Sequence, residues 1–504
     1  MGVFPAFGLI LSFLLFAVSA EEDVILITPP AGEVIPPCIA DGYLGSYGRP
    51  LQQVFVLPLE CALGSRGFLD FLNDSKDFVP FSPSEGERTL VWLQEAGVDD
   101  IVRGTADSFD ARLDRALKYA TTELAYLIRN GEDGFLDRQI VFGPRGRGTL
   151  ESKPGLEVLH RSPSSALISV DSLHLSHLDI ILPPFIVPIA LPSKPQPLVP
   201  VPAIAIKRIY ALLKSLRFNP EIASILSTFS LPSMESDIRH LTGEDGLGIL
   251  SRHSFSKGAR VAADWIQSKF EETGALCRQS PFLSGYAPNV ICRYAGTSNT
   301  TALVLLSAHY DSRGSFGSTR APGANDDGSG ITHLLAIARA IKENGIQFRS
   351  NVELVAFAGE EQGLLGSAAY ARELKALDAN ITLMIQADML AFHSPSEPLQ
   401  IGFPDLIGLP EAAWLVANVS NIYSPELTIG ITPACCSDHQ SFNNQGFPST
   451  QVFERAGPIL DPMYHNSGDV SDRVGYDLQQ VRSIAKATFA TVLVAAGFDG
   501  KRDP

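Results

Sequence analysis

Three apolar runs in the second half of the chain each stop at a histidine or an acidic residue. These runs are predicted strands, at residues 302–307, 352–358 and 383–386. Helical patterns at residues 258–273 and 329–343 alternate with them. Continuous apolar strands separated by helices are typical of a mostly parallel sheet that is covered on both faces. The sequence therefore predicts an α/β fold with a mixed, mostly parallel central sheet flanked by helices.

Side chains that can bind a metal or move a proton stand at the ends of these predicted strands. His309 and Asp311 follow the first strand, Glu360 and Glu361 the second, and Asp388 the third. In open α/β sheets, ligands bind beyond the carboxyl ends of the strands. Histidine and carboxylates collected there predict a two-metal hydrolase site, in which a metal-activated water reacts beside a carboxylate base.

The spacing within each pair suggests a division of roles. Asp311 lies two residues after His309, so it can accept a hydrogen bond from a metal-binding imidazole on the same side of an extended chain. Glu360 and Glu361 are adjacent and point in different directions, so one can bind a metal while the other acts as a general base. The alternatives are an ordinary loop for the first pair and a solvated acidic pair for the second.

Asp326 and His465 are the two remaining candidate metal ligands. Asp326 lies in a Gly-rich turn at residues 325–330 that begins a predicted helix. The two oxygens of its carboxylate can bridge two cations, although aspartate is also a common helix cap. His465 follows Tyr464, and a phenol beside a metal-binding histidine can stabilise an oxyanion; the alternative is an ordinary loop histidine. The joint occurrence of all these groups carries the prediction.

The first 20 residues are almost entirely apolar and end in small residues. Val18 and Ala20 suit the −3 and −1 positions of a signal-peptidase site. The alternative is a membrane anchor, which Pro5 and the small residues near the end disfavour. We therefore expect a cleaved signal peptide at residues 1–20 and a secreted, extracellular protein with no stable membrane association. The net charge of −16 further argues against a nucleic-acid partner.

Cysteines and glycosylation sequons agree with secretion. The six cysteines are Cys38, Cys61, Cys277, Cys292, Cys435 and Cys436. Closeness in the sequence makes a disulfide between the first two and another between the middle two plausible, although six cysteines allow many connectivities. The last two form a vicinal disulfide or pair elsewhere. Four N-x-S/T sequons, typical of a secreted glycoprotein, begin at Asn73, Asn299, Asn380 and Asn418.

Residues 21–215 show no recognisable catalytic pattern. A helix is predicted at residues 109–129 and a short strand at residues 166–170. The run at residues 180–206 contains eight prolines, which exclude a regular membrane helix and suggest packing against the rest of the chain. Three histidines are expected to have packed or surface roles: His160, His174 and His177. This region is either a propeptide that shields the site or a permanent lid.

Six motifs together resemble the M28 family of zinc metallopeptidases, particularly its secreted aminopeptidases of the leucine aminopeptidase type. The motifs are AHYDS, APGANDDGSG, AFAGEEQGLLGS, IQADM, SDHQSF and YHNSGD. The resemblance covers residues 234–497 and implies a zinc exopeptidase fold whose sheet has about eight strands. We therefore divide the chain into the signal peptide, an N-terminal region of unknown fold and function (21–215) and a catalytic domain (220–500).

The resemblance also implies roles for individual residues. Five ligands would hold two Zn²⁺ ions per chain: His309, Asp326, Glu361, Asp388 and His465, with Asp326 bridging. The remaining implied roles are a general base at Glu360, orientation of His309 by Asp311 and polarisation of the scissile carbonyl by Tyr464. The implied reaction removes N-terminal residues from peptides or proteins with a free N-terminus, through a water activated by both zinc ions.

Several alternatives stay open at this stage. The family usually has a cysteine where this chain has Thr432, which leaves the local disulfide and the loop near the substrate pocket undecided. Glutaminyl cyclisation occurs on the same fold with one zinc, and the full set of five ligands argues against it. A non-catalytic protein on this fold would lack ligands that this chain keeps. A carboxypeptidase or dipeptidase would need a cation for the substrate carboxylate, such as Arg455 or Arg320.

Overall fold

The computed structural model describes most of the chain between residues 23 and 500. Within this range the undescribed residues are 31–34, 59–60, 62–76, 82–87, 105–106, 120–155, 172–174, 176–177, 198, 316–317, 319 and 435. The predicted signal peptide and the sequon at Asn73 therefore lie outside the described residues, as do His174, His177 and Cys435. No helix in the described part combines the length and the apolar character needed to cross a membrane.

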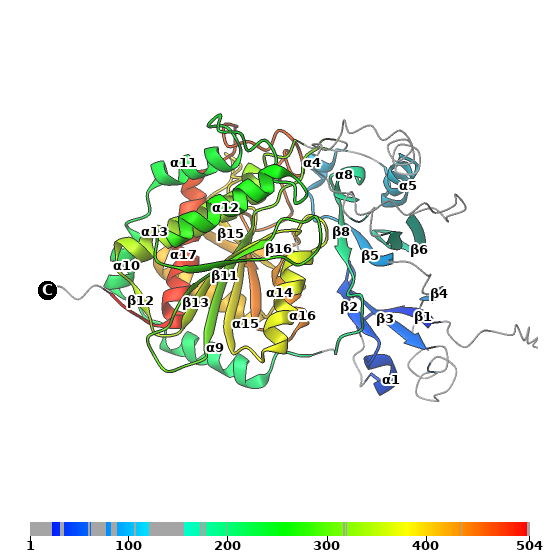
Figure 1. The fold of residues 1–504 in the computed structure, drawn as a ribbon, viewed down its shortest axis with the longest axis horizontal. Helices are drawn as coiled ribbons and strands as arrows, with labels where there is room; N and C mark the ends of the chain where they lie inside the picture. The colour runs from blue at the N-terminus through cyan, green and yellow to red at the C-terminus, as the bar shows by residue number, and fades with distance from the viewer. Residues whose placement is uncertain are drawn as a thin grey trace, which may run out of the picture.

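A six-stranded sheet forms the centre of the C-terminal part (Figure 1). In spatial order its strands are β17 (Ser449–Val452), β14 (Ile381–Ala387), β11 (Leu303–His309), β13 (Asn351–Phe357), β10 (Asn289–Tyr294) and β9 (Leu276–Ser280). The first four are parallel to their neighbours, whereas β10 and β9 run antiparallel. This arrangement confirms the predicted mixed, mostly parallel sheet.

The sheet has fewer strands than the resemblance implied. Strands β15 (Gln400–Pro404) and β16 (Thr428–Thr432) pair with each other in a separate two-stranded sheet. They meet the central sheet where Gly402 and Phe453 exchange two backbone hydrogen bonds of 2.7 and 3.0 Å. The expected count of about eight is therefore wrong for a continuous sheet, because one bridge replaces a full ladder at this edge.

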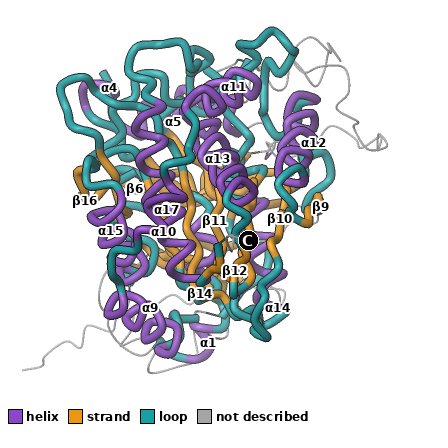
Figure 2. Tube along the Cα trace, turned by 90° about the vertical axis from the view of Figure 1, so that its left-hand side faces the viewer, coloured by secondary structure: helices purple, strands orange, loops and turns teal. Residues whose placement is uncertain are grey.

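Helices cover both faces of the central sheet. One face is covered by α9 (Ala203–Ser215), α10 (Pro220–Leu226), α11 (Leu231–Leu241), α12 (Lys257–Glu271), α13 (Ser329–Glu343), α15 (Pro410–Tyr423) and α17 (Leu478–Ala496). Helices α14 (Leu365–Ala376) and α16 (His439–Asn444) pack on the other face. Figure 2 shows α13 and α17 lying over the strands. The predicted strands are therefore buried on both sides, which explains their continuous apolar sequences.

The predicted boundaries agree closely with the observed ones where the pattern is strong. The helix expected at residues 329–343 has those limits as α13, and the strand expected at 302–307 is Leu303–His309. The helix expected at 109–129 begins correctly as α5 (Phe109–Tyr119), and the rest of its expected length lies outside the described residues.

The N-terminal region folds into two four-stranded antiparallel sheets beside the catalytic layers (Figure 1). The first contains β1 (Asp23–Thr28), β2 (Tyr43–Tyr47), β3 (Gln52–Pro58) and β4 (Asp77–Phe81). The second contains β5 (Arg88–Glu95), β6 (Leu156–Ser162), β7 (Ser165–Asp171) and β8 (Ile186–Ala190). Short helices are α1 (Pro37–Ala40), α4 (Asp100–Arg103) and α8 (Leu178–Ile181).

The N-terminal and C-terminal parts share a hydrophobic core. Trp92 of the second N-terminal sheet is fully buried in a cluster that also contains Ile25 of the first sheet. Leu364, which follows the Glu360–Glu361 pair, belongs to the same cluster. Ile189 and Leu191 of the Pro-rich run also belong to this cluster, so the run packs against the C-terminal part, as its apolar sequence predicts.

Two predicted disulfides are confirmed. Cys38 bonds to Cys61, and Cys277 bonds to Cys292 across the neighbouring strands β9 and β10. Cys436 is also disulfide-bonded, but Cys435 lies outside the described residues, so the vicinal pairing stays a prediction.

Candidate metal centre

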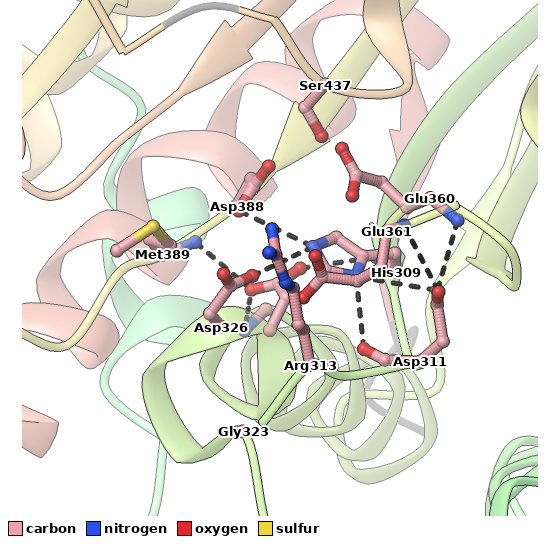
Figure 3. Close-up of polar contacts among 12 residues, drawn as sticks. His309, Asp311, Arg313, Gly323, Asp326, Glu360, Glu361, Asp388, Met389 and Ser437 are labelled. Carbon is pink, nitrogen blue, oxygen red and sulfur yellow. Dashed lines mark hydrogen bonds and ion pairs between the residues drawn. The ribbon is translucent and has the colours of Figure 1, made fainter. Parts of the chain in front are cut away.

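The five predicted ligands lie together at the carboxyl ends of the parallel strands (Figure 3). They form two groups, His309–Asp326–Asp388 and Asp326–Glu361–His465. Within each group, one potential ligand atom from every residue lies within 4.8 Å of the others, and every member is buried. The structure thus brings together side chains that are as far apart in sequence as His309 and His465.

Asp326 belongs to both groups. Its Oδ1 lies 3.2 Å from Nε2 of His309, and its Oδ2 lies 3.2 Å from Nε2 of His465. Each carboxylate oxygen therefore faces a different histidine. This is the geometry that a carboxylate shared by two cations requires.

The donor set of this cluster fits a metal. Oε1 of Glu361 is buried without a hydrogen-bond partner among the described residues, and Nε2 of His309 makes no hydrogen bond there although two carboxylate oxygens lie within 3.6 Å of it. Burial raises the pKa of Glu361, although His465 opposes this effect, whereas the pKa of Asp326 is lowered because both histidines outweigh its burial. Buried carboxylates and imidazoles in this number need a compensating cation, and mixed oxygen and nitrogen donors suit zinc.

Asp311 and Glu360 lie beside the two groups. The Asp311 carboxylate accepts backbone hydrogen bonds from Glu360 (3.3 Å) and Glu361 (3.2 Å). Nδ1 of His309 lies 3.2 Å from the Asp311 carbonyl oxygen and 3.6 Å from its carboxylate. Asp311 thus lies beside His309, but its backbone carbonyl is closer to Nδ1 than the carboxylate that the sequence suggested as acceptor, and orientation of His309 by that carboxylate stays a prediction. The Asp311 carboxylate instead holds the backbone of the acidic pair. Burial raises the pKa of Glu360 well above its usual range, and Figure 3 shows its carboxylate directed towards Ser437.

The turn between β11 and α13 resolves the two interpretations of its acidic pair. Asp326 faces the histidines, whereas Asp327 accepts a hydrogen bond of 2.9 Å from the Gly330 amide in the first turn of α13. Asp327 also accepts from the amides of His309 and Met389, each at 3.2 Å. The capping role and the cluster role therefore belong to neighbouring residues.

Asp469 supports this turn and has no role in the sequence-based prediction. Its carboxylate accepts hydrogen bonds of 3.0 Å from the amides of Asn325 and Asp326. Arg473 donates to the same carboxylate at 2.9 Å. The signal that identifies it is its place at the end of the YHNSGD motif, five residues after Tyr464.

Arg252 is a second residue that sequence reasoning missed. It is fully buried, and it donates to the backbone carbonyls of four residues around the site: Leu241, Tyr310, Pro322 and Gly323. Three of these carbonyls belong to the loop between His309 and Asp326. Arg252 therefore fixes the path of the chain that carries both ligands.

We expect Arg252→Met to lower the free energy of unfolding by about 3–5 kcal/mol, because it leaves buried carbonyls without donors. Chemical denaturation of the variant and of the unaltered protein measures this difference. The control is Arg278→Met, which removes an exposed ion pair with Glu373 and is expected to cost less than about 1 kcal/mol. Equal losses in the two variants would contradict this account of Arg252.

Tyr464 packs on the ligand that follows it. Its ring stacks on His465 with centroids 3.7 Å apart, and burial raises the pKa of its phenol well above the usual range. The phenol therefore keeps its proton and can act as a donor. Phe185 from the N-terminal region also stacks on the Tyr464 ring, with centroids 6.5 Å apart.

The arginines considered for a substrate carboxylate lie in different surroundings. Arg455 makes two hydrogen bonds, of 2.7 and 2.8 Å, to Glu397, so its charge is already paired. Arg320 is exposed. Arg313, which the sequence did not single out, is buried, and its Nη1 lies 3.0 Å from Nδ1 of His465.

A sequence model of the family described as "Peptidase family M28" matches residues 289–492, which include all five predicted ligands. These residues, here called the M28 domain, are thus similar to peptidase family M28. The chain is therefore a peptidase, and the resemblance of its six motifs is confirmed. The M28 domain holds the whole candidate metal centre, while the segment that stacks on Tyr464 lies outside the match.

Curated relatives are similar over about half of this chain. Leucine aminopeptidase 1 of Arthroderma gypseum is 28% identical over 289 residues, which cover 52% of this chain and 74% of that protein. A probable leucine aminopeptidase of Arthroderma otae is 29% identical over 280 residues, with coverage of 52% and 73%.

Solved structures support the fold over a longer part of the chain. The LapA aminopeptidase of Legionella pneumophila has a TM-score of 0.53 at 18% identity and covers 69% of this chain and 95% of its own. LapB from the same organism has a TM-score of 0.55 at 14% identity, with coverage of 82% and 100%. At these identities the likeness establishes the fold alone.

Proposed function

We propose that this protein is a secreted zinc aminopeptidase that removes N-terminal residues from peptides. The observation that carries the proposal is the pair of ligand groups that share Asp326, with Glu360 beside them but in neither group. The M28 match and the leucine aminopeptidase relatives support the same reaction class. Secretion is supported by the apolar N-terminal sequence and by the disulfide bonds.

The residues of the two groups would hold two zinc ions. His309, Asp326 and Asp388 would bind one ion, and Asp326, Glu361 and His465 the other. When bound, zinc supplies a Lewis acid that lowers the pKa of water and polarises a carbonyl group. Asp311 would keep His309 in a fixed orientation through the Nδ1 contact.

Glu360 would carry the proton of the reaction. Its carboxylate accepts a proton from the attacking water and delivers that proton to the departing amine. The Tyr464 phenol donates a hydrogen bond to the oxyanion that develops on the scissile carbonyl. The backbone of Glu360 is fixed by Asp311, so the base keeps its position while its carboxylate changes protonation state.

We expect the purified secreted protein to hydrolyse leucine-aminomethylcoumarin, to lose this activity on chelation and to regain it with zinc. Fluorescence release measures the rate. N-acetyl-leucine-aminomethylcoumarin is the matched control, because it presents the same side chain without a free amine. Cleavage of both substrates at the same rate would contradict aminopeptidase action.

A glutaminyl substrate distinguishes the proposed aminopeptidase from a glutaminyl cyclase. A cyclase would convert glutaminyl-aminomethylcoumarin to its pyroglutamyl form without releasing the fluorophore, whereas an aminopeptidase would release it. A protein that binds zinc and acts on neither substrate would point to a non-catalytic role or to another exopeptidase specificity.

A further inference from the structure

A turn from the N-terminal region contacts the His465 ring. It joins α8 to β8, and the Ile186 amide donates to the Pro183 carbonyl at 3.0 Å to close it. Pro184 takes the second position of this four-residue turn, where its fixed φ is favourable. The Pro183–Pro184 pair of the Pro-rich run thus has a defined local structure.

The carbonyl of Pro184 is the acceptor beside Nδ1 of His465. Nη1 of Arg313 lies 3.0 Å from the same nitrogen, but an arginine N–H only donates and cannot accept the imidazole proton. Nδ1 of His465 lies 2.7 Å from the Pro184 oxygen, while Nε2 lies 3.2 Å from carboxylate oxygens of both Asp326 and Glu361. A histidine that binds a metal through one ring nitrogen commonly donates its other N–H to a carbonyl or carboxylate, which fixes the tautomer and the ring orientation. Pro184 supplies that acceptor here.

Arg313 clamps the same turn from the M28 domain. Its Nη2 donates to the carbonyls of Leu182 at 2.7 Å and Pro183 at 3.2 Å, and its Nη1 donates to that of Ile186 at 3.4 Å. Arg313 is 3% exposed, and it lies four residues after His309 in the chain. One arginine therefore connects the loop after β11 with three backbone groups around Pro184.

Two further residues, Asp179 and Phe185, hold the turn in place. Just before it, Asp179 is fully buried, and its Oδ2 lies 2.7 Å from Nε2 of His253 and 3.0 Å from Nε2 of Gln362. Inside the turn, the Phe185 ring packs on Tyr464. The turn is thus held by a fully buried carboxylate before it and by a ring contact to the residue that precedes His465.

We propose that the N-terminal region is a permanent part of the catalytic site, in which the Pro184 carbonyl positions His465 and Arg313 and Asp179 hold that carbonyl in place. This inference rests on the proposed role of His465 as a zinc ligand. It excludes a propeptide that must leave for activity, since removal of the turn would take away the acceptor for Nδ1. It also excludes a lid that opens by lifting this turn.

The test compares three variants of the full chain: Arg313→Met, Arg313→Lys and Asp179→Asn. Zinc affinity is measured by competition with a chromogenic chelator, and kcat and KM with leucine-aminomethylcoumarin. Arg313→Met and Asp179→Asn are expected to lower the affinity for one of the two zinc ions by about 10–100-fold. Both variants should also lower kcat with little change in KM. Arg313→Lys should recover part of both losses, because an ammonium group can still donate to the carbonyls.

Arg49→Gln is the matched control. Arg49 links the N-terminal region to Asp405 and to the Pro433 carbonyl, so its loss loosens the same interface without touching the turn, and zinc affinity should stay unchanged. Thermal unfolding of all variants shows whether each is folded.

Three outcomes would overturn the inference. Higher activity in Arg313→Met or Asp179→Asn would identify the turn as an inhibitory cover, and unchanged zinc affinity would show that Pro184 does not position His465. An active secreted protein whose mature N-terminus lies beyond residue 186 would also overturn it. Failure of the proposed function looks different, because the unaltered protein itself would then bind no zinc or cleave no substrate.

Discussion

Glu360→Gln is expected to lower kcat by about 10²–10⁴-fold, the usual contribution of a general base, while both zinc ions stay bound. Glu360 belongs to neither ligand group, so the amide removes the proton acceptor without removing a ligand. The backbone hydrogen bond from Glu360 to Asp311 does not depend on the side chain, which preserves the local structure. Turnover of leucine-aminomethylcoumarin and the zinc content of the purified variant measure the two effects separately.

Glu454→Gln provides the matched control for this substitution. Glu454 is also buried, with a raised pKa caused by burial, and its Oε2 accepts from the Phe392 amide at 2.6 Å. A glutamine oxygen can keep that bond, so activity should stay within a few-fold of the unaltered protein. Retained turnover in Glu360→Gln, or an equal loss in Glu454→Gln, would remove the basis for assigning the base.

Asp326→Ala is expected to release both zinc ions and to abolish hydrolysis. Asp326 is the member that the two ligand groups share, and its two oxygens face the two histidines. Its removal leaves each group with two ligands, which is fewer than the three protein ligands typical of catalytic zinc sites. Metal analysis of the purified protein, combined with the same activity assay, tests this result.

Asp388→Ala gives a graded comparison, because Asp388 belongs to the group of His309 alone. We expect this variant to lose one zinc ion and keep the other, with a large loss of activity. If Asp326→Ala kept one ion as tightly as Asp388→Ala does, Asp326 would not be a bridging ligand.

The catalytic half of the fold could be predicted because its signals are local and strong. Strand β11 is buried along its whole length, so the hydrophobic requirement on both faces is visible as an uninterrupted apolar run. The ends of parallel strands meet at one edge of the sheet. Because β11 lies between β14 and β13, this geometry places His309 between Asp388 and Glu361 without any knowledge of the loops.

The N-terminal half could not be predicted in the same way. Its sheets pair strands that are far apart in sequence, such as β5 with β7 and β8. The local sequence of a strand does not indicate which distant strand it pairs with. The roles of Arg252, Arg313 and Asp179 were missed for a related reason. Each acts on backbone carbonyls or on side chains of distant segments, which single-sequence spacing does not encode.

The order of the ligands along the chain has a consequence for synthesis. A chain is made from its N-terminus, and domains begin to fold in that order. His309, Asp326 and Asp388 precede His465, so the first ligand group can be assembled while the second is still incomplete. The turn with Pro184 is made earlier than either group. The last ligand to emerge therefore meets an acceptor that is already present, and the growing chain has no complete centre with which to cut other peptides.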